Sequence, residues 1–496
     1  MRSPRVATSL GALAGSESGG ILCFKGIPYA APPVGDARWR APRSAQPWSD
    51  LRDATRFGCS ALQYKGDGMA DMIGIAAGPT SEDCLYLNVW TPGCDERRRP
   101  VLVWIHGGAN LVGSGAQPRI EGERLARAGD VVVVTINYRL GVFGFLHAPE
   151  LGASGNEALL DQIAALRWVR AEIAAFGGDP CNVTVFGQSA GGFDIAELMA
   201  MPAAAGCFDA AMLMSGSLTP HVSREEGAAV AERFAARFGG TSKLRDVAAG
   251  DLLEMQRELL SGTQARTARF GPVRDGELVS EDAAGPIGRG DHTRGLPVLI
   301  GHTRDEWGLW TGMDLAMASL DDAGLARRAL RLFGAHTPEA IELYREARSR
   351  RGESTRCEQL WVAMMTDARF RMPAIRTAEL HGSHTRDVWM YSFEHVSPAL
   401  HGRLGACHSL DVPFVWSTLD VDNLPRLCGT GPVVERLSSR FMRAVLAFAR
   451  HHDPSHGDLP AWPRYDAHDR ATLRLDAQCT VANAPRDEER AFCAAL

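Results

Sequence analysis

The chain has 496 residues, of which 45% are hydrophobic and 23% are charged, with 53 lysines and arginines against 59 aspartates and glutamates. The net charge of −6, without a basic run, argues against a nucleic-acid partner. No apolar run approaches the ~18 residues that a membrane span requires. The 11 cysteines are too few for a disulfide scaffold and odd in number, so we expect most of them to be free thiols.

The N-terminal run VATSLGALAG (6–15) follows Arg2 and Arg5 and has some features of a short signal peptide. However, Thr8, Ser9 and two glycines interrupt the apolar pattern, which alternates as a strand does. We therefore interpret it as a first hairpin and expect a cytoplasmic protein rather than a secreted one.

Short β-branched runs alternate with helical patterns along the chain, which indicates βαβ units around a mostly parallel sheet flanked by helices. Strands are predicted at 101–105, 131–136, 182–186, 211–214, 297–301 and 388–393. Helices are predicted over 159–176, at 195–199 and near 437–448, and residues 307–384 are mainly helical. We predict a single α/β domain over 1–496, with 307–384 as a helical insertion over one end of the sheet.

The segment GQSAG (187–191) is the candidate catalytic motif, because it joins the strand at 182–186 to the helix at 195–199. A serine at a sharp strand-to-helix turn is the context of a nucleophile elbow, and the glycines two residues either side avoid a clash across the turn. Ser189 is therefore a candidate nucleophile.

A hydroxyl that attacks a carbonyl also needs a base and donors for the oxyanion. The segment IHGGAN (105–110) ends the strand at 101–105 with two glycines, which lets backbone N–H groups point into a cavity. A His-Gly-Gly run upstream of an elbow is typical of esterase oxyanion holes, and the N–H of Ala190 would complete this one.

With these motifs the chain resembles the type-B carboxylesterases, in the cholinesterase-like branch of the α/β-hydrolase fold, and among them bacterial para-nitrobenzyl-esterase-like members. The matching segments are ordered along almost the whole chain. They are FKGIPYAAPPVGDARW (24–39), SEDCLYLNVWTP (81–92), VWIHGGA (103–109), NYRLGVFGFL (137–146), the segment GNEALLDQIAALRWV that ends at 169, FGGDPCNVTVFGQSAGG (176–192) and LPAWPRYD (459–466).

The resemblance implies a Ser–Glu–His triad made of Ser189, Glu306 and His408. From the residues alone, Asp305 and Asp411 are rival acids, and His302, His384 and His395 are rival bases. The resemblance also assigns the oxyanion donors to the N–H groups of Gly108, Ala109 and Ala190. The implied reaction is ester hydrolysis through an acyl-enzyme, and it uses no cofactor and no metal ion.

Several positions depart from the family pattern. Gln188 stands where a glutamate usually precedes the nucleophile, Ala109 replaces a third glycine, Asn110 replaces an aromatic residue, and Trp307 replaces the glycine after the acid. We expect these changes to affect substrate shape, with Asn110, Trp307 and Trp310 in the pocket. Further candidate pocket residues are Trp361, Met364, Met365 and Phe370, for which a place in the core is the alternative.

The resemblance further implies a loop-closing disulfide between Cys59 and Cys84, which a reducing compartment would leave as thiols. It also implies a buried ion pair of Arg38 with Glu82. The segment 60–83 contains no tryptophan, which argues against a choline-binding cation–π site.

The leading hypothesis is thus a serine hydrolase for small uncharged or weakly charged esters, acting as a monomer or small homo-oligomer. One alternative is a carbamate or amide hydrolase with the same triad. Another is a non-catalytic adhesion relative, which the presence of all three triad residues argues against. A thiol enzyme built on Cys407 lacks an elbow around that cysteine.

Overall fold

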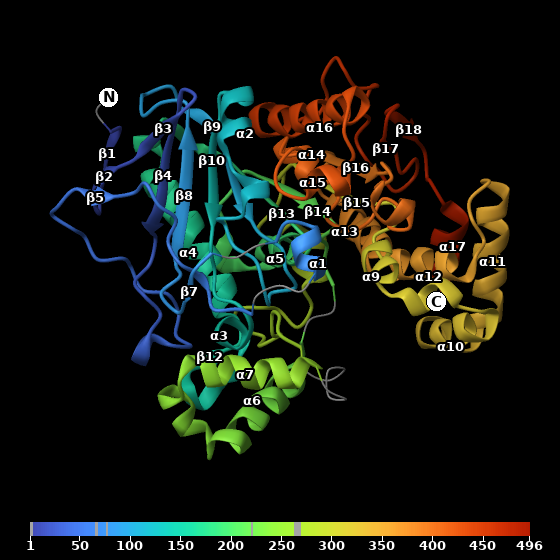
Figure 1. Ribbon diagram of the computed structural model, residues 1–496, viewed down its shortest axis with the longest axis horizontal. Helices are drawn as coiled ribbons and strands as arrows, with labels where there is room; N and C mark the ends of the chain where they lie inside the picture. Colours follow the sequence, from blue (N-terminus) through green and yellow to red (C-terminus); the bar gives the residue numbers. More distant parts are fainter. Residues whose placement is uncertain (1–2, 65–67, 76–77, 220–221, 262–268) are drawn as a thin grey trace.

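The computed structural model describes residues 3–64, 68–75, 78–219, 222–261 and 269–496, and its centre is a large mixed sheet (Figure 1). The strand order is β18-β17-β16-β15-β14-β13-β9-β10-β8-β4-β3. The strands from β10 to β17 in this order are parallel, and antiparallel strands flank them on both sides. The strands are β3 (Ser16–Ser18), β4 (Ile21–Pro28), β8 (Tyr86–Thr91), β9 (Arg99–Ile105), β10 (Val132–Ile136), β13 (Gly178–Gln188), β14 (Ala210–Met214), β15 (Val298–Thr303), β16 (Val388–Phe393), β17 (Thr472–Leu475) and β18 (Thr480–Ala482).

The six strands predicted from apolar runs are all present, and they form the parallel centre of the sheet. Every residue of β9 is buried, because helices cover both faces. Successive side chains of a strand point to opposite faces. Accordingly, Val101 and Val103 pack in the core on one face, while Leu102 and Trp104 pack in the core on the other. Because both faces of the sheet are buried, these strands appear in the sequence as continuous hydrophobic runs.

Helices line the two faces of the sheet (Figure 1). The helix predicted over 159–176 forms α4 (Glu157–Glu172) and a following 3₁₀ turn. It packs with α5 (Ala190–Ala200) in the core on the sheet face that carries Val101 and Val103. The predicted C-terminal helix is α16 (Pro432–His451), which packs with Trp104 in the core on the opposite face of the sheet. The remaining helices outside the 307–384 segment are α1 (Gly68–Met72), α2 (Glu123–Gly129), α3 (Gly141–Phe145), α6 (Arg224–Phe238), α7 (Ala249–Ser261), α8 (Ala284–Arg289), α14 (Val412–Trp416), α15 (Leu424–Cys428) and α17 (Asp487–Ala495).

The N-terminal hairpin is confirmed by the antiparallel pair β1 (Arg5–Thr8) and β2 (Gly11–Ala14). Gly11 at the turn has φ +145°, and a Cβ there would lie 2.4 Å from the Trp48 ring nitrogen. The glycine therefore permits the close approach that joins the hairpin to the body of the protein.

The segment between β15 and β16 is helical and builds its own hydrophobic cluster around Tyr344, Leu360 and Met364. Figure 1 shows these helices grouped at one side of the sheet. They are α9 (Gly308–Met313), α10 (Asp322–Phe333), α11 (Thr337–Arg350), α12 (Cys357–Thr366) and α13 (Met372–Gly382). A second helical segment, α6 and α7, leaves the sheet between β14 and β15 and was not predicted from the sequence.

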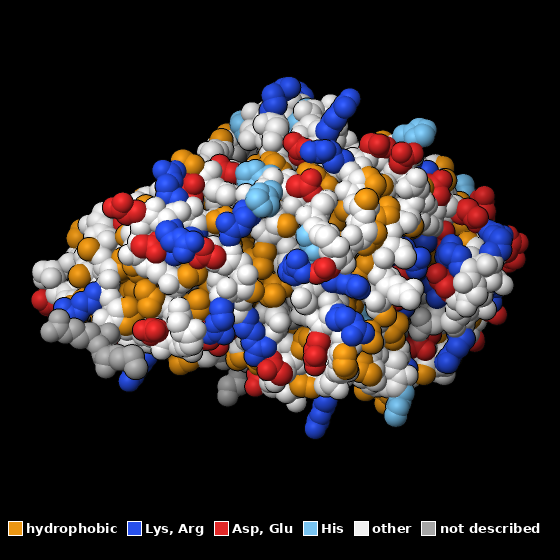
Figure 2. Space-filling view, turned by 90° about the horizontal axis from the view of Figure 1, so that it is seen from above, with side chains coloured by type: hydrophobic (Ala, Val, Ile, Leu, Met, Phe, Trp, Pro, Cys, Tyr) orange, Lys and Arg blue, Asp and Glu red, His pale blue; other side chains and the backbone are white. Residues whose placement is uncertain are grey.

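The surface carries charges of both signs. Figure 2 shows lysines and arginines interspersed with aspartates and glutamates over the face in view. Within the described part of the chain, none of the helices has both the length and the hydropathy of a membrane span.

The disulfide expected between Cys59 and Cys84 is not formed: both residues are free thiols, as are the other cysteines. Other contacts hold the loop between them. Its ends pair as β6 (Ser60–Ala61) and β7 (Thr80–Ser81), and the ion pair predicted for Arg38 is present, with Nε 2.6 Å from Glu82 Oε2. Burial raises the pKa of the Cys84 thiol and so disfavours the reactive thiolate.

The buried pair of Arg139 and Asp161 yields a stability prediction. Arg139 Nη2 lies 2.7 Å from Asp161 Oδ1, and neither side chain is more than 3% exposed. Asp161→Ala leaves a buried guanidinium unpaired, and we expect a loss of about 3–5 kcal/mol in the free energy of unfolding. The control Asp420→Ala removes the exposed partner of Arg124 and should cost at most about 1 kcal/mol. Urea midpoints measure both changes, and equal shifts would contradict a special role for burial.

Candidate active site

The candidate nucleophile Ser189 occupies a strained turn between β13 and α5. Its φ of +56° and ψ of −124° lie outside the regions that L-residues favour. The turn is crowded: a Cβ on Gly191 would lie 2.0 Å from Ile105 O, and a Cβ on Gly187 would lie 2.7 Å from the same atom. The N–H of Ser189 donates to Met214 O at 2.9 Å, which ties the turn to β14. The side chain is partly exposed, as a nucleophile requires.

The loop after β9 lies directly against this turn. A Cβ on Gly107 would lie 2.5 Å from Gln188 O and 3.1 Å from Ser189 Cβ. Gly108 (φ +128°) and Ala109 (φ +56°) both have left-handed backbone conformations. Among the described residues, no acceptor is found for the Gly108 and Ala109 N–H groups. Ala190, the first residue of α5, likewise has no N–H acceptor within its helix. These three donors are free to bind an oxyanion.

His106 supports the loop that follows β9. Its ring stacks on Tyr138 with centroids 4.4 Å apart, and the Tyr138 hydroxyl donates to His106 O at 2.6 Å. Burial lowers the pKa of His106 to about 4, so the ring is neutral at physiological pH. It is a structural residue rather than a base.

Glu306 and His408 form a fully buried pair. Glu306 Oε2 lies 2.5 Å from His408 Nδ1, and Glu306 Oε1 accepts the Thr303 N–H at 2.8 Å. Burial acts to raise the pKa of Glu306, but the facing His408 and the Thr303 N–H outweigh it, and the pKa is lowered. Glu306 is therefore ionised and fixes the proton of the imidazole on Nδ1.

Gln188 occupies the other side of the imidazole, where its Nε2 lies 3.0 Å from His408 Nε2. Because Nδ1 carries the proton, the ring Nε2 is an acceptor, and the Gln188 amide donates to it. Among the described residues, no hydrogen bond joins the Ser189 hydroxyl to His408. The contact nevertheless brings the imidazole Nε2 to the residue adjoining Ser189. The sequence marked Gln188 as unusual but carried no signal of this contact.

Backbone hydrogen bonds join the loop that carries Glu306 to the loop that carries His408. The N–H of Asp305 donates to Ala406 O at 3.0 Å, and the N–H of His408 donates to Glu306 O at 3.2 Å. Asp305 Oδ2 also accepts the Ala406 N–H at 2.9 Å. The two side chains of the pair are thus held in register by their own main chains.

The rival acids have other partners. Asp305 pairs with Arg304 at 2.7 Å. Asp411 accepts the Tyr391 hydroxyl at 3.1 Å, and burial together with the charge of Glu306 raises its pKa to about 7. Neither bonds to an imidazole.

The rival bases also bond elsewhere. The rings of His302, His384 and His395 bond to the carbonyls of Thr303, Ile287 and Cys428 respectively. Burial raises the pKa of the Cys407 thiol, which argues against a thiol nucleophile.

A cavity of about 520 Å³ opens beside Ser189, and its walls include Asn110, Trp307, Trp310 and Phe370. Trp310 and Phe370 pack on the His408 ring, with centroids 5.1 Å and 5.0 Å from it. The other candidates for the pocket, Trp361, Met364 and Met365, lie instead in the hydrophobic cluster of the 307–384 helices. Helical periodicity in the sequence does not distinguish residues of the cavity wall from residues of this cluster.

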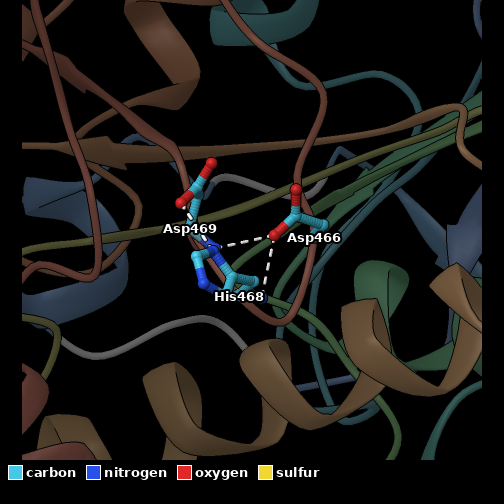
Figure 3. A group of neighbouring side chains, drawn as sticks. All are labelled: Asp466, His468 and Asp469. Carbon is cyan, nitrogen blue, oxygen red and sulfur yellow. Dashed lines mark hydrogen bonds and ion pairs between the residues drawn. The ribbon is translucent and has the colours of Figure 1, made fainter.

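An exposed group of Asp466, His468 and Asp469 is drawn in Figure 3. Asp466 Oδ1 accepts the N–H groups of His468 and Asp469 at 2.8 Å and 2.7 Å, which accounts for the arrangement as a turn. None of the three lines the cavity beside Ser189.

Known proteins resemble this chain over almost its whole length. The family model described as "Carboxylesterase family" matches residues 2–493. The chain is 38% identical to para-nitrobenzyl esterase of Bacillus subtilis (strain 168), over 98% of this chain and 97% of that protein. It is 36% identical to phenmedipham hydrolase of Pseudarthrobacter oxydans, over 95% and 94% of the two chains. Its fold is similar to a crystal structure of a Geobacillus stearothermophilus carboxylesterase, with a TM-score of 0.87 and 37% identity over 98% of this chain and 99% of that one.

Replacement of Gln188 tests its contact with the imidazole. In Gln188→Glu a carboxylate beside Nε2 favours the protonated ring, which cannot act as a base. We expect the acidic limb of the kcat/KM profile for a neutral ester to move up by about one pH unit. Gln188→Met, of similar size and uncharged, should keep the limb at the wild-type pH. A Glu variant whose profile coincides with the wild type would show that residue 188 does not face the base.

Proposed function

Because the chain belongs to the carboxylesterase family, it is a serine hydrolase of carboxylic esters, and we propose that Ser189, His408 and Glu306 carry out its reaction. The observation that carries the proposal is the 2.5 Å contact between Glu306 and His408, whose other nitrogen reaches the residue next to Ser189. This arrangement places the imidazole Nε2, which accepts the Gln188 amide, next to the strained serine.

In the first half-reaction the Ser189 hydroxyl attacks the ester carbonyl while His408 Nε2 takes its proton. For this step Nε2 must exchange the Gln188 amide for the hydroxyl, and catalytic hydrogen bonds of this kind often form only with substrate bound. Glu306 stays ionised and stabilises the imidazolium.

The tetrahedral oxyanion is stabilised by the N–H groups of Gly108, Ala109 and Ala190. Each such donor contributes about 2.7–4 kcal/mol to the barrier reduction in enzymes of this type. His408 then protonates the leaving alcohol, and the acyl group remains on Ser189. Water, activated by the same imidazole, hydrolyses the acyl-enzyme and releases the acid.

We also propose that residues 1–496 form one catalytic domain in which the 307–384 helices are an insertion. They depart from β15 and return at the adjacent β16, and they supply Trp307, Trp310 and Phe370 to the cavity wall. A cytoplasmic location is consistent with the eleven free thiols.

The nucleophile assignment predicts that Ser189→Ala abolishes p-nitrophenyl ester hydrolysis without a change in the circular dichroism spectrum. A fluorophosphonate should label the wild type stoichiometrically, and mass spectrometry of the digest should place the label on Ser189. Turnover by the alanine variant at the wild-type rate, or a label on a different peptide, would refute the assignment.

The acid assignment predicts that Glu306→Gln lowers kcat by about 10³–10⁴-fold, because an amide neither enforces the Nδ1 tautomer nor stabilises the imidazolium. Asp305→Asn and Asp411→Asn are matched comparisons at neighbouring buried carboxylates that form no hydrogen bond with His408. Their losses should be at least tenfold smaller. A loss in Asp411→Asn equal to that in Glu306→Gln would make Asp411 the acid.

A further inference from the structure

The wall of the cavity beside Ser189 is mostly apolar, with Leu111, Phe193, Phe270 and Trp310 among its residues. Its charged lining residues in the described part of the chain are Asp194, Arg269 and Arg369. A site of this kind takes a largely apolar ligand, with specificity set by the few polar groups. The charged residues therefore indicate which esters the site favours.

Asp194 is engaged within the protein. It is fully buried on α5, where its two oxygens accept hydrogen bonds from Asn110 Nδ2 at 3.3 Å and Gln162 Nε2 at 2.6 Å. It therefore belongs to the wall behind the oxyanion loop and is not exposed to attract a cation.

Arg269 and Arg369 are both exposed, and neither has an ion pair or hydrogen bond with another described residue. Some exposed arginines of this surface are paired, as Arg124 is with Asp420 and Arg443 is with Asp458. The two unpaired guanidinium groups come from segments a hundred positions apart, and they line the same cavity.

The acidic residues closest in sequence to the two arginines have other partners. Asp367, two residues before Arg369, pairs with Arg371 at 2.6 Å. Asp275, the first acid after Arg269, accepts the backbone N–H groups of residues 277–279 and the Asn156 amide. Within the part of the chain that the structure describes, no residue forms an ion pair with either arginine, so their positive charge is available to a ligand.

We propose that the preferred substrates are carboxylic esters that carry an additional anionic oxygen group, a carboxylate or a phosphate, on the part of the molecule that extends to the cavity mouth. This inference rests on the proposed ester hydrolysis at Ser189. Guanidinium groups bind both anions through paired N–H donors. On a protein with net charge −6, two local cations also steer an anion toward the serine. The scissile bond and the products remain those of ordinary ester hydrolysis.

Because both arginines are exposed, their contribution is modest and depends on salt. Exposed ion pairs change an equilibrium about 1.5- to 5-fold each. Ionic strength near 0.5 M screens most of that attraction.

The test compares two p-nitrophenyl esters of equal chain length, the octanoate and the mono-ester of suberic acid, which differ in a terminal methyl or carboxylate. The readout is the ratio of kcat/KM for the anionic ester to that for the neutral one, which cancels differences in active enzyme between samples. We expect Arg269→Gln/Arg369→Gln to lower this ratio about 2- to 25-fold. About 0.5 M NaCl should lower the wild-type ratio similarly. Arg331→Gln, an exposed arginine on α10 outside the cavity, should leave it unchanged.

A ratio that is the same in the double variant and the wild type would overturn the inference while leaving ester hydrolysis intact. Failure of the wild type to hydrolyse either ester would instead refute the proposed function. A third ester, with a terminal phosphate in place of the carboxylate, distinguishes the two anions: whichever shows the larger ratio in the wild type and the larger loss in the double variant is the preferred group.

Discussion

The structure depends on the buried contact between Glu306 and His408. A carboxylate without solvent is costly unless it is paired, and this one receives the imidazole on one oxygen and a backbone N–H on the other. The two loops that carry the pair are separated by a hundred residues, and three hydrogen bonds between Asp305–Glu306 and Ala406–His408 join them. The order β13-β14-β15 then sets the distance from this pair to Ser189, because parallel strands end at the same edge of the sheet.

The surroundings of this contact combine a strained backbone with aromatic side chains that exclude water. The positive-φ conformations of Ser189 and Ala109 cost energy, which the surrounding packing has to offset. Trp310 and Phe370 cover the imidazole and lower the local dielectric, which strengthens the electrostatic interactions of Glu306 with it. Water retains access at the mouth of the cavity, where Arg269 and Arg369 are exposed. The reacting groups thus lie in the buried part of the cavity, and the arginines proposed to select the substrate lie at its mouth.

The fold was predictable where the burial of a strand or helix requires a regular hydrophobic pattern in the sequence. The buried parallel strands appear as apolar runs, and the stripe of α4 follows the helical period. The antiparallel strands β4 and β8 and the helices α6 and α7 were not predicted, because their patterns are mixed and their partners lie far along the chain. The Cys59–Cys84 bond was expected by resemblance, yet both cysteines remain thiols in a loop held by strand pairing and the Arg38–Glu82 pair.

The sequence by itself determined the strand–turn–helix around Ser189 and the glycines of the loop at 107–108, because both are local: the backbone geometry is set by residues within a few positions. The assignment of Glu306 and His408 needed the family resemblance, since neither stands out among 59 acidic residues and 15 histidines. Only the tertiary structure decided which groups face the imidazole, namely Glu306, Gln188, Trp310 and Phe370. It alone also brought Arg269 and Arg369 to one opening. These contacts join residues between 38 and 220 positions apart, and no short-range periodicity encodes which distant segment packs against which.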